Sequence, residues 1–297
     1  MRRFLPVLTV VAALIVVWYA AAVALNAQWT RDQAARAGVE AGFGDILRDA
    51  FVQERPKLPA PHQVAAEFWR STFVEEATGR RGIVRSGSLS NRSLIYHGLV
   101  TLSAAALGFA IGAGFGILLA VGIVHNRAMD ASVMPWAIAS QTVPILAIAP
   151  MIIVVLASVG VTGLVPKAVI SAYLSFFPVV VGMVKGLRSP DPMQLDLMRT
   201  WGASGAQIFL RLRLPASVPY LFASMKVGAA AALVGAIVGE LPVQEGGLGA
   251  RLLAGSYYGQ TVQIWAALMA AALLAAAIVG AIGAAERATL ARMGFGR

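Results

Sequence analysis

The sequence predicts an all-α, polytopic membrane protein with six transmembrane helices. Only 13% of its 297 residues are charged, whereas soluble domains carry about 25%. The mean hydropathy is +0.74. A chain this poor in polar side chains cannot coat a water-soluble globule, so most of its surface is expected to face lipid. Six apolar stretches also approach or exceed the roughly 20 residues that a spanning helix needs.

The six predicted spans follow one another along the chain. They cover Phe4–Leu25, part of Leu94–Val124, Ala131–Val159, Leu164–Val184, Val218–Val238 and Val262–Ala285. None of them contains Asp or Glu, which argues against a proton-coupled carrier because such carriers usually need an intramembrane carboxylate. Lys167 and Lys226 lie near span ends, where we expect their ammonium groups to snorkel to the interface.

The first span follows two arginines, as the core of a signal peptide would. Its uncharged run is longer than the roughly 7–15 residues of such a core, so we expect residues 1–25 to be a retained first transmembrane helix. Lys and Arg exceed Asp and Glu in the terminal segments and in residues 185–213, whereas the two short loops on the other side carry no net charge when taken together. The positive-inside rule then places both termini inside.

This orientation predicts the domain organisation. Residues 26–93 form an external segment with short helices, and residues 94–297 form the core transmembrane domain. Within the core, residues 193–215 face the inner side of the membrane and interrupt the series of spans.

The composition and motifs exclude several function classes. The chain has no cysteine and its three histidines are far apart, so we expect no metal site and no catalytic residue. There is no phosphate-binding loop of the G-x-x-x-x-G-K-[ST] form, so no nucleotide cofactor is expected in this chain. The net charge of +10 is explained by inner-face basic residues, and no nucleic-acid partner is expected.

Two features of the spans involve small or polar residues. Gly108, Gly112 and Gly116 repeat every four residues in the second span, a spacing that lets another helix approach closely. In the third span, the run Ser140, Gln141, Thr142 precedes Pro144, where a kink is expected. These polar groups either line a solute path or satisfy a kink buried between helices, and the sequence leaves both open.

The segment Arg199–Pro215 is basic and contains two glycines, Gly202 and Gly205. It predicts two short amphipathic helices with a glycine break, lying along the inner membrane face and stopped by Pro215. A plain interfacial helix is an equally good interpretation of the residues alone.

The spacing in this segment resembles a cytoplasmic motif of bacterial ABC importer permeases, E-A-A-x3-G-x9-I-x-L-P. Asp196-Leu197-Met198 takes the E-A-A place, Gly202 the glycine, Leu212 the isoleucine and Leu214-Pro215 the ending. Other stretches resemble the nitrate, sulfonate and taurine branch of that family. They are Leu58–Val64, Ser140–Pro150, Ser175–Leu187 and Gly246–Gly249. The resemblance runs from Leu58 to the C-terminus, and residues 26–56 have no counterpart.

The resemblance implies a type I importer permease fold in the bacterial cytoplasmic (inner) membrane, with cytoplasmic coupling helices between spans 4 and 5. Its partners would be two cytoplasmic ABC ATPases that bind ATP and magnesium, a second permease copy, a periplasmic solute-binding protein and the lipid bilayer. This chain would be a non-catalytic subunit. The ATPase-coupling residues would be Asp196, Leu197, Met198, Arg199, Gly202, Ala203, Leu212, Leu214 and Pro215.

The implied solute is small, either an anion such as a sulfonate or nitrate, or an aromatic or vitamin-like compound. Two other classes remain as alternatives, namely a secondary carrier and a membrane-embedded enzyme. A carrier would tend to show inverted repeats and an interior carboxylate, and an enzyme would need polar residues clustered at one depth. Neither pattern is evident in the sequence.

Overall fold

The computed structural model describes residues 4–40, 42–74, 76–79, 82–85, 93–243 and 245–294. Apart from an antiparallel hairpin of β1 (Glu76–Gly79) and β2 (Gly82–Arg85), the regular elements of this described part are helices. The chain divides into two compact units. Unit 1 comprises Met1–Gly98 and Ala250–Ala271, and unit 2 comprises Leu99–Gly249 and Ala272–Arg297.

Unit 1 is built on the long first helix. Its helices are α1 (Phe4–Arg36), α2 (Phe43–Val52), α3 (Pro61–Trp69), the π-helix η1 (Arg70–Val74), most of α11 (Leu248–Tyr257) and the first parts of α4 (Leu94–His125) and α12 (Thr261–Arg292). The side chain of Thr30 donates to Asp49 at 2.6 Å, which joins α1 to α2. Asn26 is fully buried. Its Oδ1 accepts from the amides of Lys57 and Leu58 at 2.8 and 3.3 Å, so α1 holds the loop that leads into α3.

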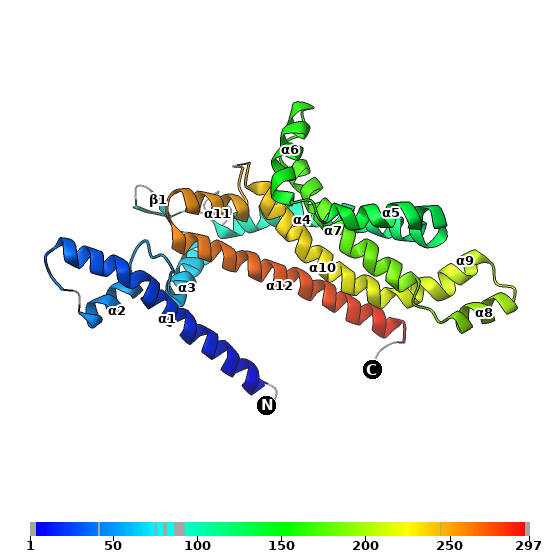
Figure 1. Cartoon of the computed structure of the whole chain (residues 1–297), viewed down its shortest axis with the longest axis horizontal. Helices are drawn as coiled ribbons and strands as arrows, with labels where there is room; N and C mark the ends of the chain where they lie inside the picture. Colours follow the sequence, from blue (N-terminus) through cyan, green and yellow to red (C-terminus); the bar gives the residue numbers. More distant parts are fainter. Residues whose placement is uncertain are drawn as a thin grey trace. The chain divides into compact units, whose positions relative to one another are not determined.

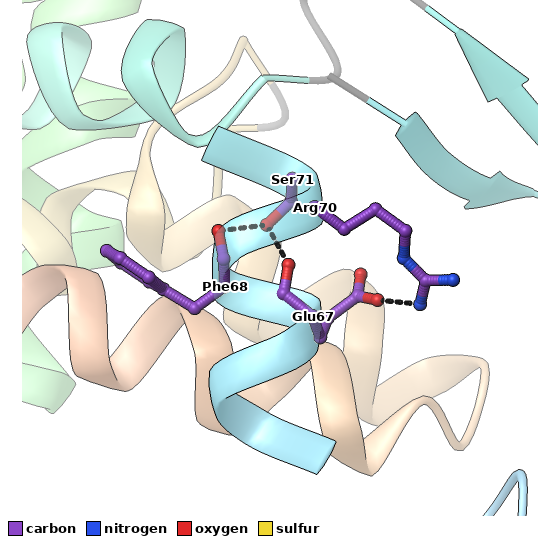
Figure 2. Close-up of polar contacts among 4 residues, drawn as sticks. All are labelled: Glu67, Phe68, Arg70 and Ser71. Atoms are coloured by element: carbon purple, nitrogen blue, oxygen red, sulfur yellow. Dashed lines mark hydrogen bonds and ion pairs between the residues drawn. The ribbon is translucent and has the colours of Figure 1, made fainter. Parts of the chain in front are cut away.

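The α3–η1 junction carries a buried carboxylate, shown in Figure 2. Glu67 is 3% exposed and forms an ion pair with Arg70. The Ser71 hydroxyl donates to the Glu67 carbonyl at 2.6 Å, one turn back along the helix. On α11, burial lowers the pKa of the Arg251 guanidinium, whereas the Glu67 carboxylate raises it. These charges are therefore balanced locally inside unit 1.

Unit 2 contains the central helices. Its elements are most of α4 (Leu94–His125), α5 (Arg127–Ser140), α6 (Ile145–Ser158), α7 (Leu164–Leu187), α8 (Pro192–Thr200), α9 (Gly205–Ile208), the π-helix η2 (Phe209–Arg213), α10 (Leu214–Glu240) and the second part of α12 (Thr261–Arg292). The helices α7 and α10 pack along each other (Figure 1). A core of buried side chains joins α4 to α7: Ala120, Ile123, Val180, Met183, Val184 and Leu187.

Small residues let α4 and α10 approach α7 closely. A Cβ at Gly108 of α4 would lie 2.4 Å from Ser171 Cβ, and one at Gly235 of α10 would lie 2.7 Å from Ser171 Cα. Both distances are below any real Cβ contact. The Ser171 hydroxyl donates to the carbonyl of Ala232 at 2.6 Å, so α7 meets α4 and α10 at one residue. Gly112 and Gly116 continue this contact with α7.

The prediction of an all-α, multi-pass fold is confirmed, with the small β1–β2 hairpin as an addition. Within the described residues, five helices are long and apolar enough to cross a membrane, and a sixth span exists if α5 and α6 count as one. The predicted third span is wrong as a single kinked helix, because α5 and α6 bend by 100°. Pro144 is the N-cap residue directly before α6, and it has no N–H with which to continue α5.

The predicted stop at Pro215 is also wrong. The helix passes from α9 through η2 into α10, so that Gly205–Glu240 is one helical run of 36 residues. The amide of Leu214 donates to Phe209 five residues back. A proline removes one N–H and crowds the preceding turn, and the wider π turn that precedes Pro215 accommodates it. Pro219 lies inside α10.

Two expectations about charge in the spans also change. The helices are longer than the apolar runs, so α10 reaches Glu240 and α12 contains Glu286. Lys226 forms an ion pair with Glu286. Lys167 is 3% exposed and lies 3.8 Å from Glu245, so it does not snorkel along an open surface. The carboxylates that seemed absent from the spans lie at or beyond the ends of the apolar runs.

The close approach of α4 to α7 generates the first prediction. A Gly112→Ala change places a Cβ 2.1 Å from Ser175 Oγ and 2.7 Å from the backbone oxygen of Ala172. Overpacking of this kind costs about 1–3 kcal/mol, so the midpoint of thermal unfolding in detergent should fall. Gly114→Ala is the matched control, because no atom lies within 4 Å of its Cβ position. Equal midpoints for the two variants would contradict this packing.

Candidate functional site

The segment between α7 and α10 leaves the helical bundle at two fixed points. At the end of α7, the Arg188 guanidinium lies 2.8 Å from the Asp130 carboxylate of α5. At the return, Phe209 packs against the buried core of α4 and α7, and its ring lies 5.1 Å from that of His125. Along the chain, α8 and the turn after it come between these points, and α8 projects beyond the ends of α7 and α10 (Figure 1). Both ends of the segment are therefore held, while its middle extends away.

Local sequence signals set the bounds of α8. The Asp191 side chain accepts from the Met193 amide at 2.8 Å, and Pro192 follows at the first helical position. At the other end Gly202 has φ +72°, a conformation that glycine adopts without a steric penalty. The amide of Ala203 donates to Met198 at 3.0 Å, and that of Gly202 donates to Arg199 at 2.9 Å. These two bonds form a Schellman motif, which ends α8.

A second cap starts the next helix directly after this turn. The Ser204 hydroxyl accepts from the Gln207 amide at 3.3 Å. The Gln207 side chain accepts in return from the Ser204 amide at 2.8 Å. This capping box fixes where the helix through α9 begins. The end of α8 and the capped start of α9 therefore meet at residues 202–204. Gly202, the glycine of the predicted motif, allows the turn between them.

The surface of α8 is exposed and partly apolar. Met193, Leu197 and Trp201 are 81%, 51% and 75% exposed, and their spacing of four residues places them along one side of the helix. Asp196 and Arg199 lie 3.2 Å apart and are also exposed. No residue of α8 is buried. This surface is suited to contact with another protein, since an apolar stripe with polar neighbours is typical of an interface.

The structure divides the nine residues of the predicted coupling set into two groups. The first five, from Asp196 to Gly202 along the chain, belong to α8 and its terminal turn, and only Met198 among them is half-buried rather than exposed. Ala203, Leu212, Leu214 and Pro215 are half-buried, and Leu214 packs against the core of α4 and α7. The early residues therefore present a surface, and the later ones anchor the segment.

The corner between α5 and α6 holds the residues of the predicted solute path. The Ser140 hydroxyl donates to Ala137 at 2.7 Å, and the Thr142 hydroxyl donates to Ala139 at 2.8 Å. The Tyr173 hydroxyl of α7 donates to the Ser140 carbonyl. These hydroxyls satisfy carbonyls at the end of α5. The side chain of Gln141 is exposed at the same corner, and Pro144 supplies no side-chain acceptor to the first amides of α6.

One buried group was missed by the sequence analysis. Glu240 is fully buried at the end of α10, where its carboxylate accepts from Thr101 and Gly249. The predicted span stopped at Val238, so the residue was assigned to a loop. The signal that could have found it is the glycine-rich run Gly246–Gly249, because glycines allow a backbone to wrap closely around a side chain.

The sequence of residues 112–289 matches the family model described as the inner-membrane component of binding-protein-dependent transport systems. This match covers more than half of the chain and includes α7, the coupling set and α10. The chain belongs to this family. Its members are permeases of ABC transporters, and the resemblance to the nitrate and sulfonate branch is shown by the relatives.

Three relatives of this permease illustrate the range. The riboflavin transport system permease protein RibX of Chloroflexus aurantiacus is 30% identical over 230 residues, which are 77% of this chain and 78% of the relative. The formylaminopyrimidine transport permease protein ThiX of Halalkalibacterium halodurans is 30% identical over 167 residues, 56% and 65% of the two chains. The nitrate import permease protein NrtB of Synechococcus elongatus is 22% identical over 193 residues, 65% of each chain.

The Schellman turn of this permease generates a second prediction. In Gly202→Ala the new side chain must occupy a left-handed conformation, which costs roughly 1–2 kcal/mol, so hydrogen exchange at residues 192–204 should become faster. Gly205→Ala is the control, because it adds a better helix former to α9 at an open position. The exchange is measured by mass spectrometry in detergent. Faster exchange in both variants, or in neither, would contradict the role of the turn.

Proposed function

We propose that this ABC importer permease works in a bacterial cytoplasmic membrane with α8 seated on a separate cytoplasmic ATPase. The observation that carries the proposal is the apolar stripe of Met193, Leu197 and Trp201 on a helix with no buried residue. Such a stripe is unfavourable in water, and contact with a partner would cover it. Family membership implies an ATPase and a solute-binding protein as partners.

The charge distribution supports the cytoplasmic placement of α8. Basic residues gather near it at Arg188, Arg199, Arg211 and Arg213, and short basic loops lie on the cytoplasmic side of membrane proteins. The last helix also ends on a basic residue, Arg292. Both termini would then be cytoplasmic, and the residues between α1 and α4 would face the periplasm together with the loop after α10.

The geometry suggests how ATP-driven movement would enter this chain. ATP and magnesium would bind to the ATPase, and this chain would catalyse no reaction. Movement of α8 would pass through the turn at residues 202–204 into the helical run Gly205–Glu240, because the run begins at that turn without a flexible linker. A pair of permease copies would form the pathway, and rigid movement of their helices would alternate its access.

The corner between α5 and α6 is the proposed place of solute contact. The side-chain amide of Gln141 and the first backbone amides of α6 can donate hydrogen bonds. The amino end of a helix also favours negative charge. A small anion such as a sulfonate or nitrate therefore fits this corner. A neutral heteroaromatic solute is the second candidate, because RibX and ThiX share more identity with this chain than NrtB does.

Membership of this transport family favours an importer over the two other classes that the sequence left open. A secondary carrier would move solute without an ATPase. A membrane-embedded enzyme would need reactive groups gathered at one depth, whereas the polar groups at the α5–α6 corner are hydroxyls bonded to backbone carbonyls and one amide.

Replacement of Trp201 tests the docking of α8. Trp201→Ala should reduce the ATPase that co-purifies with the permease by at least about tenfold, because buried aromatic anchors in interfaces commonly contribute more than 1.4 kcal/mol. Tyr257→Ala is the control, since Tyr257 is equally exposed, at 75%, on α11. Uptake driven by ATP should fall in parallel. Unchanged recovery of the ATPase with Trp201→Ala would exclude this docking surface.

Replacement of Gln141 tests the solute path in proteoliposomes with the ATPase and binding protein. Gln141→Leu should lower uptake severalfold while the ATPase still co-purifies. Thr142→Val should have little effect, because that hydroxyl is already bonded to Ala139. Uptake of labelled taurine and nitrate, compared with riboflavin, distinguishes the two solute classes. Normal uptake by Gln141→Leu would remove the corner from the pathway.

A further inference from the structure

The carboxylate of Glu240, at the end of α10, caps the next helix along the chain, α11. Its Oε2 accepts from the Gly249 amide at 2.8 Å and from the Thr101 hydroxyl at 3.1 Å. The Thr101 oxygen accepts in turn from the Leu248 amide at 2.9 Å. Leu248 and Gly249 are the first residues of α11, whose amides have no partner within their own helix. Glu240 of α10 and Thr101 of α4 supply those acceptors.

The glycine-rich run before α11 is explained by this cap. Gly246 and Gly247 have φ +100° and +109°, which are backbone conformations that residues with side chains rarely adopt. As glycines, they also have no side chain that could cap α11. A Cβ at Gly247 would lie 2.1 Å from the Glu240 carboxyl carbon, and a Cβ at Gly249 would lie 2.2 Å from the Ile237 oxygen. The backbone therefore wraps around the carboxylate, and any larger residue would displace it.

Burial makes this contact costly to break. Glu240, Thr101 and Leu248 are all fully buried, and the loss of one partner would leave a polar group unpaired, at roughly 1–3 kcal/mol or more for a charge. Lys167 is 3% exposed and lies near the start of α7, beside the end of α10. A Cβ added at Gly239 would lie 3.2 Å from the Cα of Lys167. The charge of Glu240 thus has a basic residue near it.

Glu240 and the turn that follows α8 lie at opposite ends of one helical run. The run Gly205–Glu240 has 36 residues and begins at the capping box of Ser204. At 1.5 Å per residue this is about 54 Å, which exceeds the thickness of a bilayer core of about 30 Å. A displacement applied at α8 would therefore reach the other side of the membrane through a single element.

We propose that Glu240 is a positioning residue for transport, which links the far end of the α10 helical run to α4 and to the start of α11 through Thr101. This inference rests on the proposed function, in which α8 receives the movement of an ATPase. Without the link, the ATPase would still bind and hydrolyse ATP, but the first residues of α11 would no longer follow the end of α10. Uptake would then become uncoupled from hydrolysis.

The test uses the assembled importer, with its ATPase and binding protein, in proteoliposomes. Thr101→Val removes the hydroxyl while it keeps the shape of the side chain, and Thr101→Ser restores the hydroxyl. We expect Thr101→Val to lower the amount of solute taken up per ATP at least fivefold, with ATP hydrolysis within about twofold of wild type. Thr101→Ser should behave as wild type. Glu240→Gln keeps an acceptor oxygen and should retain more coupling than Glu240→Leu.

Hydrogen exchange supplies a second readout that does not require transport. The amides of residues 246–252 should exchange faster in Thr101→Val and Glu240→Leu, while those of α7 stay protected. Wild-type uptake per ATP in Thr101→Val and Glu240→Leu would overturn the proposal, as would unchanged exchange at residues 246–252. Failure of the wild-type chain to co-purify with an ATPase, or to take up solute with ATP, would instead contradict the proposed function.

Discussion

The close packing of α7 between α4 and α10 is the constraint on which unit 2 depends. Inside lipid, apolar side chains gain little by leaving one apolar medium for another, so helices associate mainly through tight contact and hydrogen bonds. Glycines on α4 and α10 face the same residue of α7, Ser171, whose hydroxyl bonds to α10. Three helices thereby become one body, and the segments at its two ends are positioned by it.

This body explains why the segment between α7 and α10 can be both exposed and stiff. Its two attachments, the ion pair of Arg188 with Asp130 and the packing of Phe209, belong to the bundle. Between them, a Schellman turn and a capping box fix the backbone through hydrogen bonds within the segment itself. The segment can therefore present apolar side chains to a partner without first paying the entropy of ordering its own backbone.

The sequence predicted the helices and the family because both depend on local signals. Lipid-length apolar runs mark the spans, and the spacing from Asp196 to Pro215 marks the coupling motif. It did not predict the 100° corner at Pro144, because a proline is compatible with a kink or with a break. Continuity through Pro215 was missed because a π turn has no sequence signature of its own. Glu240 was missed because one of its partners, Thr101, is distant in the sequence, and only folding brings the two together.

The corner between α5 and α6 has a consequence for hydration. Hydroxyls and amides of this chain satisfy the carbonyls at the end of α5, but Pro144 offers the opening amides of α6 no side-chain acceptor. The Ala147 amide donates to the Pro144 carbonyl. Hydrocarbon has no acceptors for the amides before it, so at membrane depth these would require water or another protein beside them. A solute that replaces such water must offset the loss of its hydrogen bonds. Strong acceptors can do this, whereas an apolar molecule of the same size cannot.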